Sequence, residues 1–230
     1  MRDELLLKKI AVIRTDFPEK FGIPRQSGLA DAEGRIVFEP EYRNPDALRG
    51  IEAYSHLWII WGFSQVPERE WQPMVRPPRL GGNQRMGVFA TRSPFRPNPV
   101  GLSLAELVSV EQSRNQGTVL CVRGVDMLDG TPVYDIKPYL PCVEAREGAA
   151  DGFAGRVKDR RLLVEIPDEQ LRMVPQDKRR ILEELLMQDP RPAYQVDPDR
   201  VYGMTYAGME IKFQVRGDRL KVCGIYEKVH

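Results

Sequence analysis

The segment from Gly87 to Gly101, GVFATRSPFRPNPVG, combines residues that bind charged ligands with residues that stiffen the chain. Arg92, Arg96 and Asn98 supply guanidinium and amide donors, and a guanidinium can pair with a carboxylate or phosphate through two parallel hydrogen bonds. The interspersed prolines fix φ and push the preceding residues toward extended backbone. Such a segment loses little entropy when a ligand binds. The alternative is a rigid connector whose arginines are only solvated.

The same segment lies in a stretch with an unusual charge distribution. The whole chain has a formal net charge of +1, yet residues 71–105 contain no Asp, Glu or Lys. Every charged side chain in this stretch is an arginine: Arg76, Arg79, Arg85, Arg92 and Arg96. Arginine in place of lysine favours planar, bidentate or stacking recognition of a ligand.

Two further segments place polar groups on turns. In LDGTPVYDIKP, a turn at Asp129–Pro132 precedes a predicted strand with Asp135 and Lys137 at its flanks. In FGIPRQ, a proline-stiffened loop offers Arg25 and Gln26. Taken alone, the first is also compatible with a plain hairpin turn.

Residues suited to metal or imidazole chemistry are scarce. The three cysteines are widely spaced, and the only histidines are His56 and His230. Disulfide frameworks and zinc sites need closely spaced sets of ligands. Histidine-based triads and Cys-His nucleophiles need an interior histidine with a partner. The sequence therefore predicts no metal site and little acid-base work by imidazole.

The elements that must position these residues are mostly strands. Strand-like runs separated by turn signals occur at 9–14, 34–38, 56–63, 86–90, 102–110 and 118–122, with one short helical candidate at 45–51. Many strands without intervening helices favour a barrel or sandwich over a doubly wound sheet. The chain also lacks any Gly-x-Gly, part of the nucleotide-binding fingerprint of doubly wound folds.

A change in composition predicts two domains. The polar, glycine-containing stretch 144–155 is typical of a linker, which divides the chain into residues 1–145 and 156–230. In the second part, Pro175 and Pro190 bracket a predicted helix with an apolar stripe at Ile181, Leu182, Leu185 and Leu186. Alternating residues then predict a β-hairpin over 210–226. The expected fold is mainly β, with a small α+β C-terminal domain.

Hydropathy predicts a cytoplasmic protein without a membrane anchor. No apolar run approaches the roughly 20 residues that a spanning helix needs. The N-terminus, MRDE, lacks the pattern of a signal peptide.

Four motifs in chain order, KFGIPRQSGL, AYSHLWIIW, GVFATRSPFRPNPVGLSL and LDGTPVYDIKPYLP, resemble the TrmO (YaeB, TsaA-like) family of tRNA methyltransferases. The product of that family is the N-methylated form of threonylcarbamoyladenosine next to the anticodon. The resemblance is dense over residues 10–141 and resumes at 188–194. It breaks down over 143–165 and is loose in the final hairpin, which leaves substrate contacts there unassigned.

The resemblance implies S-adenosylmethionine as the cofactor, bound on a single-sheeted β-barrel whose loops replace the glycine fingerprint. The cofactor contacts that it implies fall on Pro24, Arg25, Gln26, His56, Leu57, Arg92, Leu102, Asp129, Gly130, Thr131 and Pro132. A guanidinium of Arg25 or Arg92 suits the methionine carboxylate. Gln26 and the backbone around Leu102 suit the adenine edge.

The acceptor nitrogen joins a purine to a carbamoyl group and is a poor nucleophile until its proton leaves. A base is therefore expected, and with histidine scarce the candidates are Asp135, Asp189 and Tyr194. The loop DPRPAY can fold over the cofactor domain to present such a group, or it can only end the preceding helix. Substrate contacts are expected at Arg96, Asn98, Lys137 and Arg191.

The favoured function is thus a tRNA (adenine-N-)methyltransferase acting on the anticodon arm, and the family implies a homodimer. Two alternatives stay open at this point. One is a non-catalytic RNA- or nucleotide-binding module that uses the arginine loop for phosphates. The other is a methyltransferase of the same fold with a small-molecule substrate.

Overall fold

The computed structural model describes residues 4–67, 70–77, 84–154, 161–191 and 197–228. Within these ranges, the strands and α-helices in chain order are β1 (Ala11–Thr15), β2 (Glu33–Phe38), β3 (His56–Gly62), β4 (Met74–Val75), β5 (Met86–Gly87), β6 (Val100–Ser113), β7 (Gly117–Arg123), β8 (Thr131–Pro138), α1 (Pro141–Glu144), β9 (Leu163–Glu165), α2 (Asp168–Leu171), α3 (Arg179–Met187), β10 (Tyr202–Tyr206), β11 (Met209–Arg216) and β12 (Arg219–Glu227).

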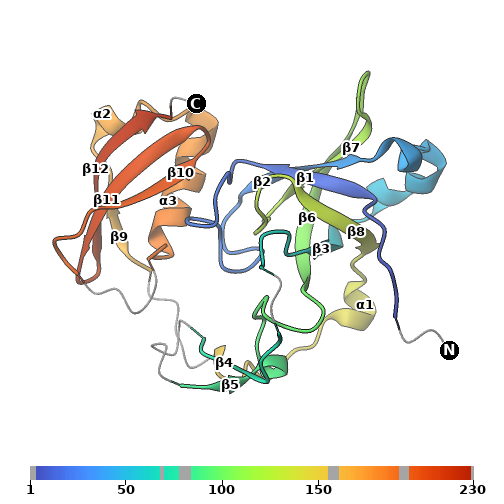
Figure 1. Cartoon of the computed structure of the whole chain (residues 1–230). Helices are drawn as coiled ribbons and strands as arrows, with labels where there is room; N and C mark the ends of the chain where they lie inside the picture. Colours follow the sequence, from blue (N-terminus) through green and yellow to red (C-terminus); the bar gives the residue numbers. More distant parts are fainter. Residues whose placement is uncertain (1–3, 68–69, 78–83, 155–160, 192–196, 229–230) are drawn as a thin grey trace.

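Six strands of the N-terminal part form a closed antiparallel barrel in the order β1-β2-β7-β6-β3-β8 (Figure 1). Successive side chains of a strand point alternately into and out of the barrel, so every second residue fills the barrel interior. In β3, Leu57, Ile59 and Trp61 are buried while the residues between them are half-exposed. The prediction of a mainly β protein with an N-terminal barrel is confirmed.

The C-terminal part is a four-stranded sheet in the order β10-β11-β12-β9, with α2 and α3 packed beside it (Figure 1). The predicted hairpin corresponds to β11 and β12. The predicted helix consists of a short 3-10 turn at Gln176–Lys178, directly after Pro175, followed by α3. The apolar stripe of α3 is buried as expected. This α+β unit confirms the predicted C-terminal architecture.

Two predicted elements differ from the structure. The expected strand at 86–90 is extended only over Met86–Gly87, because the carbonyl of Val88 accepts hydrogen bonds from the amide and hydroxyl of Thr91 and closes a 3-10 turn. The expected helix at 45–51 is a 3-10 turn over Pro45–Leu48. Gly50 follows it with a left-handed φ of 87°, which a continuing helix excludes. Strands β4, β9 and β10 were not predicted, since short segments carry little periodicity.

The loop between β1 and β2 joins the barrel to the C-terminal sheet. The ring centroids of Phe17 and Tyr206 lie 5.7 Å apart, and those of Phe21 and Phe213 lie 6.5 Å apart. Gly22 permits the close approach, because a Cβ there would lie 2.7 Å from the Cε of Met204. One continuous hydrophobic core therefore extends through both parts.

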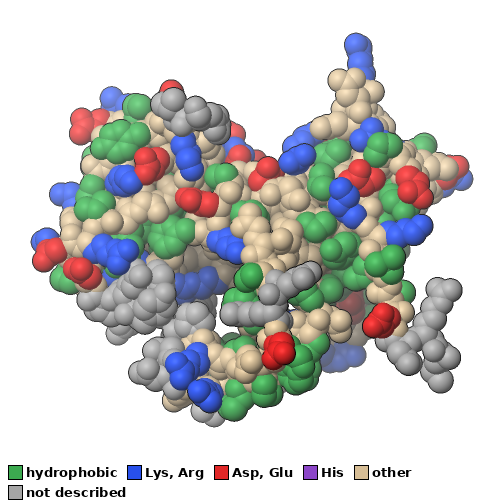
Figure 2. Space-filling model, viewed as in Figure 1, with side chains coloured by type: hydrophobic (Ala, Val, Ile, Leu, Met, Phe, Trp, Pro, Cys, Tyr) green, Lys and Arg blue, Asp and Glu red, His purple; other side chains and the backbone are tan. Residues whose placement is uncertain are grey.

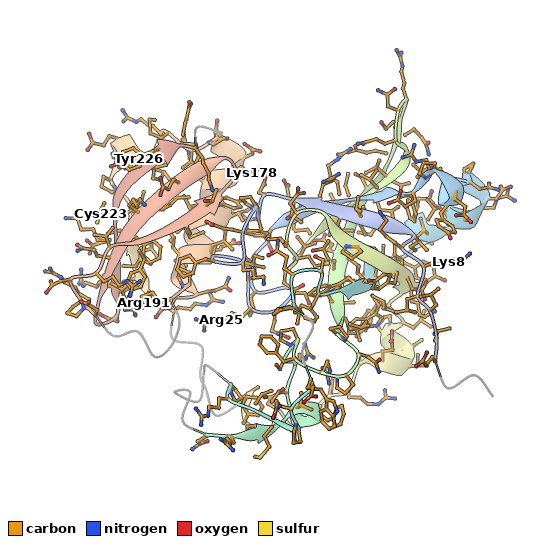
Figure 3. All side chains as sticks on the ribbon, viewed as in Figure 1. Lys8, Arg25, Lys178, Arg191, Cys223 and Tyr226 are labelled. Atoms are coloured by element: carbon orange, nitrogen blue, oxygen red, sulfur yellow. The ribbon has the colours of Figure 1, made fainter. Side chains whose placement is uncertain are left out.

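Ion pairs and hydrogen bonds surround this apolar contact. The Lys178 ammonium lies 2.9 Å from Asp16 and 2.8 Å from Glu33, and Figure 3 shows Lys178 directed toward the barrel. Glu184 accepts a hydrogen bond of 2.9 Å from the amide of Asp31. The junction therefore positions the segment after α3 against the loop that carries Arg25.

Candidate ligand pocket

A cavity of about 630 Å³, called pocket 1, opens where the β1–β2 loop, strand β3, the arginine segment and the start of β6 meet. It is lined by Lys20, Ile23, Pro24, Arg25, Gln26, Trp58, Trp61, Gly62, Phe63, Ser64, Gln65, Val66, Pro67, Arg92, Pro94, Phe95, Arg96, Val100, Gly101, Leu102, Ser103, Asp126, Leu128 and Thr131. Aromatic and aliphatic groups form most of this wall.

Most charged side chains that line pocket 1 are positive. Its cations are Lys20, Arg25, Arg92 and Arg96, whereas Asp126 is the one acid among its described lining residues. Such a site suits a ligand with one or more negative groups and leaves one place for a positive or proton-donating group.

Short local hydrogen bonds hold the arginine segment in place. The amide of Arg96 donates to the carbonyl of Pro94 at 3.0 Å, and the amide of Val100 donates to that of Asn98 at 2.8 Å. The prolines restrict the backbone between these turns. As a result, Arg92 and Arg96 line pocket 1, whereas Asn98 is exposed and does not.

Arg25 and Gln26 tie pocket 1 to the C-terminal part. The Arg92 guanidinium donates to the Gln26 side-chain oxygen, and Gln26 also donates to the carbonyl of Arg25. The Arg25 guanidinium donates to the carbonyls of Asp189 and Arg191, the latter at 3.2 Å. Figure 3 shows Arg25 and Arg191 approaching one another from the two parts of the molecule.

A hydrogen-bond chain runs along the floor of pocket 1. The Trp61 indole N–H donates to the Ser103 hydroxyl at 2.9 Å, and that hydroxyl donates to Oδ1 of Asp126 at 2.6 Å. Ser103 is 1% exposed. Burial raises the pKa of the Asp126 carboxyl, while the Ser103 hydroxyl, backbone amides and the Arg92 charge lower it to a smaller extent.

The predicted cofactor residues divide between pocket 1 and other places. Pro24, Arg25, Gln26, Arg92, Leu102 and Thr131 line pocket 1. Gly130 and Pro132 flank Thr131 at the start of β8 without lining the cavity. Asp129 accepts a 3.0 Å hydrogen bond from the amide of Thr15 and lies 3.5 Å from the Arg14 guanidinium, so it stabilises this turn.

His56 and Leu57 lie at the start of β3 and do not line pocket 1, although the next residue, Trp58, does. Leu57 is fully buried in the barrel core. The His56 ring contacts the Ser55 hydroxyl at 3.0 Å and the Tyr139 ring edge-on.

Of the predicted base and substrate residues that the structure describes, only Arg96 lines pocket 1. Asp135 and Lys137 form an ion pair of 2.9 Å with each other on β8. Both carboxylate oxygens of Asp189 accept from the Arg191 guanidinium, at 2.8 and 2.9 Å. Tyr194 lies outside the described residues.

Reasoning from the sequence missed Asp126, Ser103 and Trp61. The sequence did contain a sign of this site, because Asp126 stands between two apolar residues, Val125 and Met127. A carboxylate is costly to bury, so an acid in such a position suggests a functional role. Only the closed barrel brings this acid next to Ser103 and Trp61, which come from β6 and β3.

A second cavity of about 790 Å³, pocket 2, adjoins pocket 1 and shares Gln26, Arg92, Pro94 and Phe95 with it. Arg76 and Arg85 also line it. Nearby, the exposed rings of Trp71 and Phe89 form a tilted pair with centroids 6.3 Å apart. Figure 2 shows hydrophobic and basic side chains together over the β4–β5 ribbon.

Among the described residues, no cluster of three or more His, Cys, Asp or Glu side chains is placed to hold a metal ion. In the same part of the chain, no helix is long and apolar enough to cross a membrane.

The fold and pocket define a β-barrel protein with a cationic and aromatic cavity, joined through Arg25 to a C-terminal α+β unit. Comparison with known proteins narrows this class. The tRNA-methyltransferase O N-terminal domain model matches residues 12–145, and the TrmO C-terminal domain model matches residues 161–228. The chain belongs to the tRNA-methyltransferase O (TrmO) family.

Relatives and solved structures agree with this membership. The Escherichia coli K12 protein named tRNA (adenine(37)-N6)-methyltransferase is 45% identical over 216 residues, covering 91% of each chain. The protein of the same name from Eikenella corrodens is 52% identical over 71% of this chain and 92% of its own length. A crystal structure of TrmO from Pseudomonas aeruginosa superposes with a TM-score of 0.78 at 33% identity, covering 99% of this chain and 100% of that one.

Proposed function

We propose that this protein transfers the methyl group of S-adenosylmethionine to the exocyclic amino nitrogen of threonylcarbamoyladenosine next to the anticodon of tRNA. The main support is pocket 1, which combines guanidinium donors, aromatic walls and the Asp126 carboxylate in a chain of the TrmO family. A Pseudomonas aeruginosa relative, 39% identical over 94% of this chain, carries the words S-adenosylmethionine-dependent methyltransferase in its name.

The residues of pocket 1 fit S-adenosylmethionine. A volume of about 630 Å³ lies within the range of about 300–1,000 Å³ typical of cavities for such ligands. Arg92 or Arg25 suits the methionine carboxylate. The apolar wall around Trp61 and Phe63 suits the adenine ring, and Gln26, held by Arg92, suits its polar edge. Bound S-adenosylmethionine supplies a methyl group already activated for displacement, so the residues of the site mainly align donor and acceptor.

Pocket 2 and the surface beside it suit the anticodon arm. Arg76 and Arg85 can pair with phosphates, while the exposed rings of Trp71 and Phe89 can stack on unpaired bases. Because Arg92 and Phe95 line both cavities, an RNA strand in pocket 2 would bring one nucleoside to the mouth of pocket 1. Arg96 and the exposed Asn98 would then face the substrate strand.

The C-terminal part completes the acceptor site in this proposal. The Arg25 guanidinium holds the backbone at Asp189 and Arg191 beside pocket 1. Domains 1–145 and 156–230 would therefore share one active site, which requires both to be present for methylation. The exposed Lys137 on β8 would contribute a more distant contact with tRNA.

A homodimer and a cytoplasmic location also form part of this proposal. His56 does not line pocket 1 of its own chain, and in a homodimer it would be available to the pocket of a second copy. Exposed hydrophobic side chains on β6 and around α1, including Leu102, Leu140 and Val143, would gain by burial in such an interface. Sedimentation equilibrium should give twice the chain mass, and a monomer would exclude a shared pocket.

The test incubates the purified protein with S-adenosylmethionine and tRNA that carries threonylcarbamoyladenosine. Mass spectrometry of the nucleosides should show one added methyl group on that nucleoside, with or without a chelator. Unmodified tRNA should accept far less, because polar groups that bind the carbamoyl substituent would stay unpaired. Equal methylation of both tRNAs would contradict the specificity. Tight cofactor binding without methylation of any tRNA would favour a small-molecule acceptor, and no cofactor binding would favour an RNA-binding module.

A further inference from the structure

The methylation proposed above leaves one chemical requirement unassigned. The acceptor nitrogen carries a hydrogen, and its lone pair is delocalised into the purine and the carbamoyl group. When the N–CH3 bond forms and the S–CH3 bond breaks, the sulfonium becomes a neutral thioether and the nitrogen must lose its proton. A group within hydrogen-bond reach of the acceptor has to take that proton.

Asp126 is the group in pocket 1 that is chemically able to do this. The other charged side chains of the described lining, Lys20, Arg25, Arg92 and Arg96, are ammonium and guanidinium groups, which donate hydrogen bonds and offer no acceptor. Asp135 lies outside the cavity beside Lys137, and both oxygens of Asp189 are occupied by Arg191. Asp126 is therefore identified as the proton acceptor by its position in pocket 1.

The surroundings of Asp126 give the carboxylate a fixed orientation. Because the Ser103 hydroxyl accepts from the Trp61 indole, its single hydrogen is directed to Oδ1 of Asp126. Gly101 makes room for this indole, since a Cβ there would lie 2.2 Å from the Cε2 of Trp61. The Trp61 indole, which comes from β3, thereby orients the Ser103 hydroxyl that bonds to Asp126.

We propose that Asp126 is the general base of the reaction and that Ser103 and Trp61 are its positioning residues. This inference rests on the proposed function. The acceptor N–H donates to the Asp126 carboxylate, the nitrogen attacks the methyl carbon, and the proton moves to Asp126 and then to solvent. Burial raises the pKa of Asp126, and the Ser103 hydroxyl, backbone amides and the positive charge of Arg92 offset part of that rise.

The first test compares Asp126→Asn with wild type and with Asp46→Asn, a matched change at an exposed acid outside the pocket lining. For Asp126→Asn, kcat should fall about 100-fold or more, the usual contribution of a positioned base. Its calorimetric Kd for S-adenosylmethionine should stay within about threefold of wild type, an order-of-magnitude margin. Asp46→Asn should match wild type in both quantities. A kcat within about threefold of wild type would overturn the proposal, as would a loss of cofactor affinity equal to the loss of activity.

The second test uses pH and does not depend on the stability of Asp126→Asn. The base must be ionised, so kcat should rise with pH and level off above the pKa of Asp126. Ser103→Ala removes a hydrogen bond that lowers that pKa, so its profile should shift to higher pH. Ser103→Thr keeps the hydroxyl and should restore the wild-type profile. An unshifted pH profile in Ser103→Ala would contradict the proposal that the hydrogen bond from Ser103 positions Asp126. If wild type methylates no tRNA, the proposed function fails; if it does and these variants behave as wild type, only the base assignment fails.

Discussion

Among single residues, the arginines of this protein differ most clearly in what they contact. Arg92 bonds to Gln26 at the boundary of two cavities, whereas Arg191 is committed to Asp189 and Arg25 to backbone carbonyls. A ligand carboxylate bound by Arg25 or Arg191 would compete with these contacts at the C-terminal segment. Arg92 is exposed and best placed for this role.

Replacing Arg92 with alanine should weaken S-adenosylmethionine binding by about 1.5–3 kcal/mol, the usual effect of losing a charged hydrogen bond. The melting temperature should change little, because Arg92 is exposed. Calorimetric titration measures the affinity, with Arg49→Ala as a control at an exposed ion pair outside the pocket lining. An unchanged affinity in Arg92→Ala would remove this residue from the cofactor site.

Among the elements, strands β3 and β6 shape the pocket through the pairing of Trp61 with Gly101. A residue with a side chain at position 101 would displace the indole from its place against Ser103. Gly101→Ala should therefore lower the free energy of unfolding by about 1–3 kcal/mol, as expected for overpacking. It should also reduce methylation.

Denaturant unfolding checks this prediction, with Gly87→Ala as the control. A Cβ added at Gly87 would meet no atom within 4 Å beyond its chain neighbours, and its φ is −57°, so alanine fits there. Equal unfolding free energies for the two variants would mean that the barrel accommodates the extra methyl group.

The β4–β5 ribbon and its neighbouring arginines form a second element with a testable role. If they bind phosphates, the double variant Arg76→Ala/Arg85→Ala should weaken tRNA binding and reduce the slope of log K against log salt by roughly 1.5–2. Cofactor affinity should be unchanged, since neither residue lines pocket 1. Filter binding over a salt series makes the comparison, and an unaltered slope would place the RNA elsewhere.

In the molecule as a whole, the barrel and the C-terminal sheet share a core and a polar junction. Lys178 is 17% exposed and contacts two carboxylates of the barrel part. Lys178→Met should destabilise the fold by about 1–2 kcal/mol, discounted for the partial exposure of Asp16 and Glu33. Hydrogen bonds and charges from these acids raise the pKa of Lys178 despite its burial.

The stabilisation that Lys178 contributes should depend on pH. Because the pKa of Lys178 is raised in the folded state, its stabilisation is fully present below the unfolded pKa and is lost as pH rises through the folded value. Thermal unfolding of wild type and Lys178→Met should therefore differ at neutral pH and converge in strong alkali. Arg219→Ala, at an exposed pair inside the C-terminal sheet, should change stability less. A constant difference at all pH values would mean that packing of the lysine stem dominates.

The β character of the barrel, the helix α3, the final hairpin and the family could all be predicted from the chain, because each depends on local periodicity or on contiguous motifs. Arg25, Gln26, Arg92 and Thr131 could be located in the same way, since they lie on turns with their own signals. Most other residues of the pocket could not be predicted, because they come together only through tertiary contacts. Asp126 meets Ser103 and Trp61 only after segments distant in sequence close into one barrel, and Asp189 meets Arg25 only after the C-terminal sheet packs on the β1–β2 loop. Contacts between distant segments leave no periodic trace in the chain, since they depend on packing of the whole core.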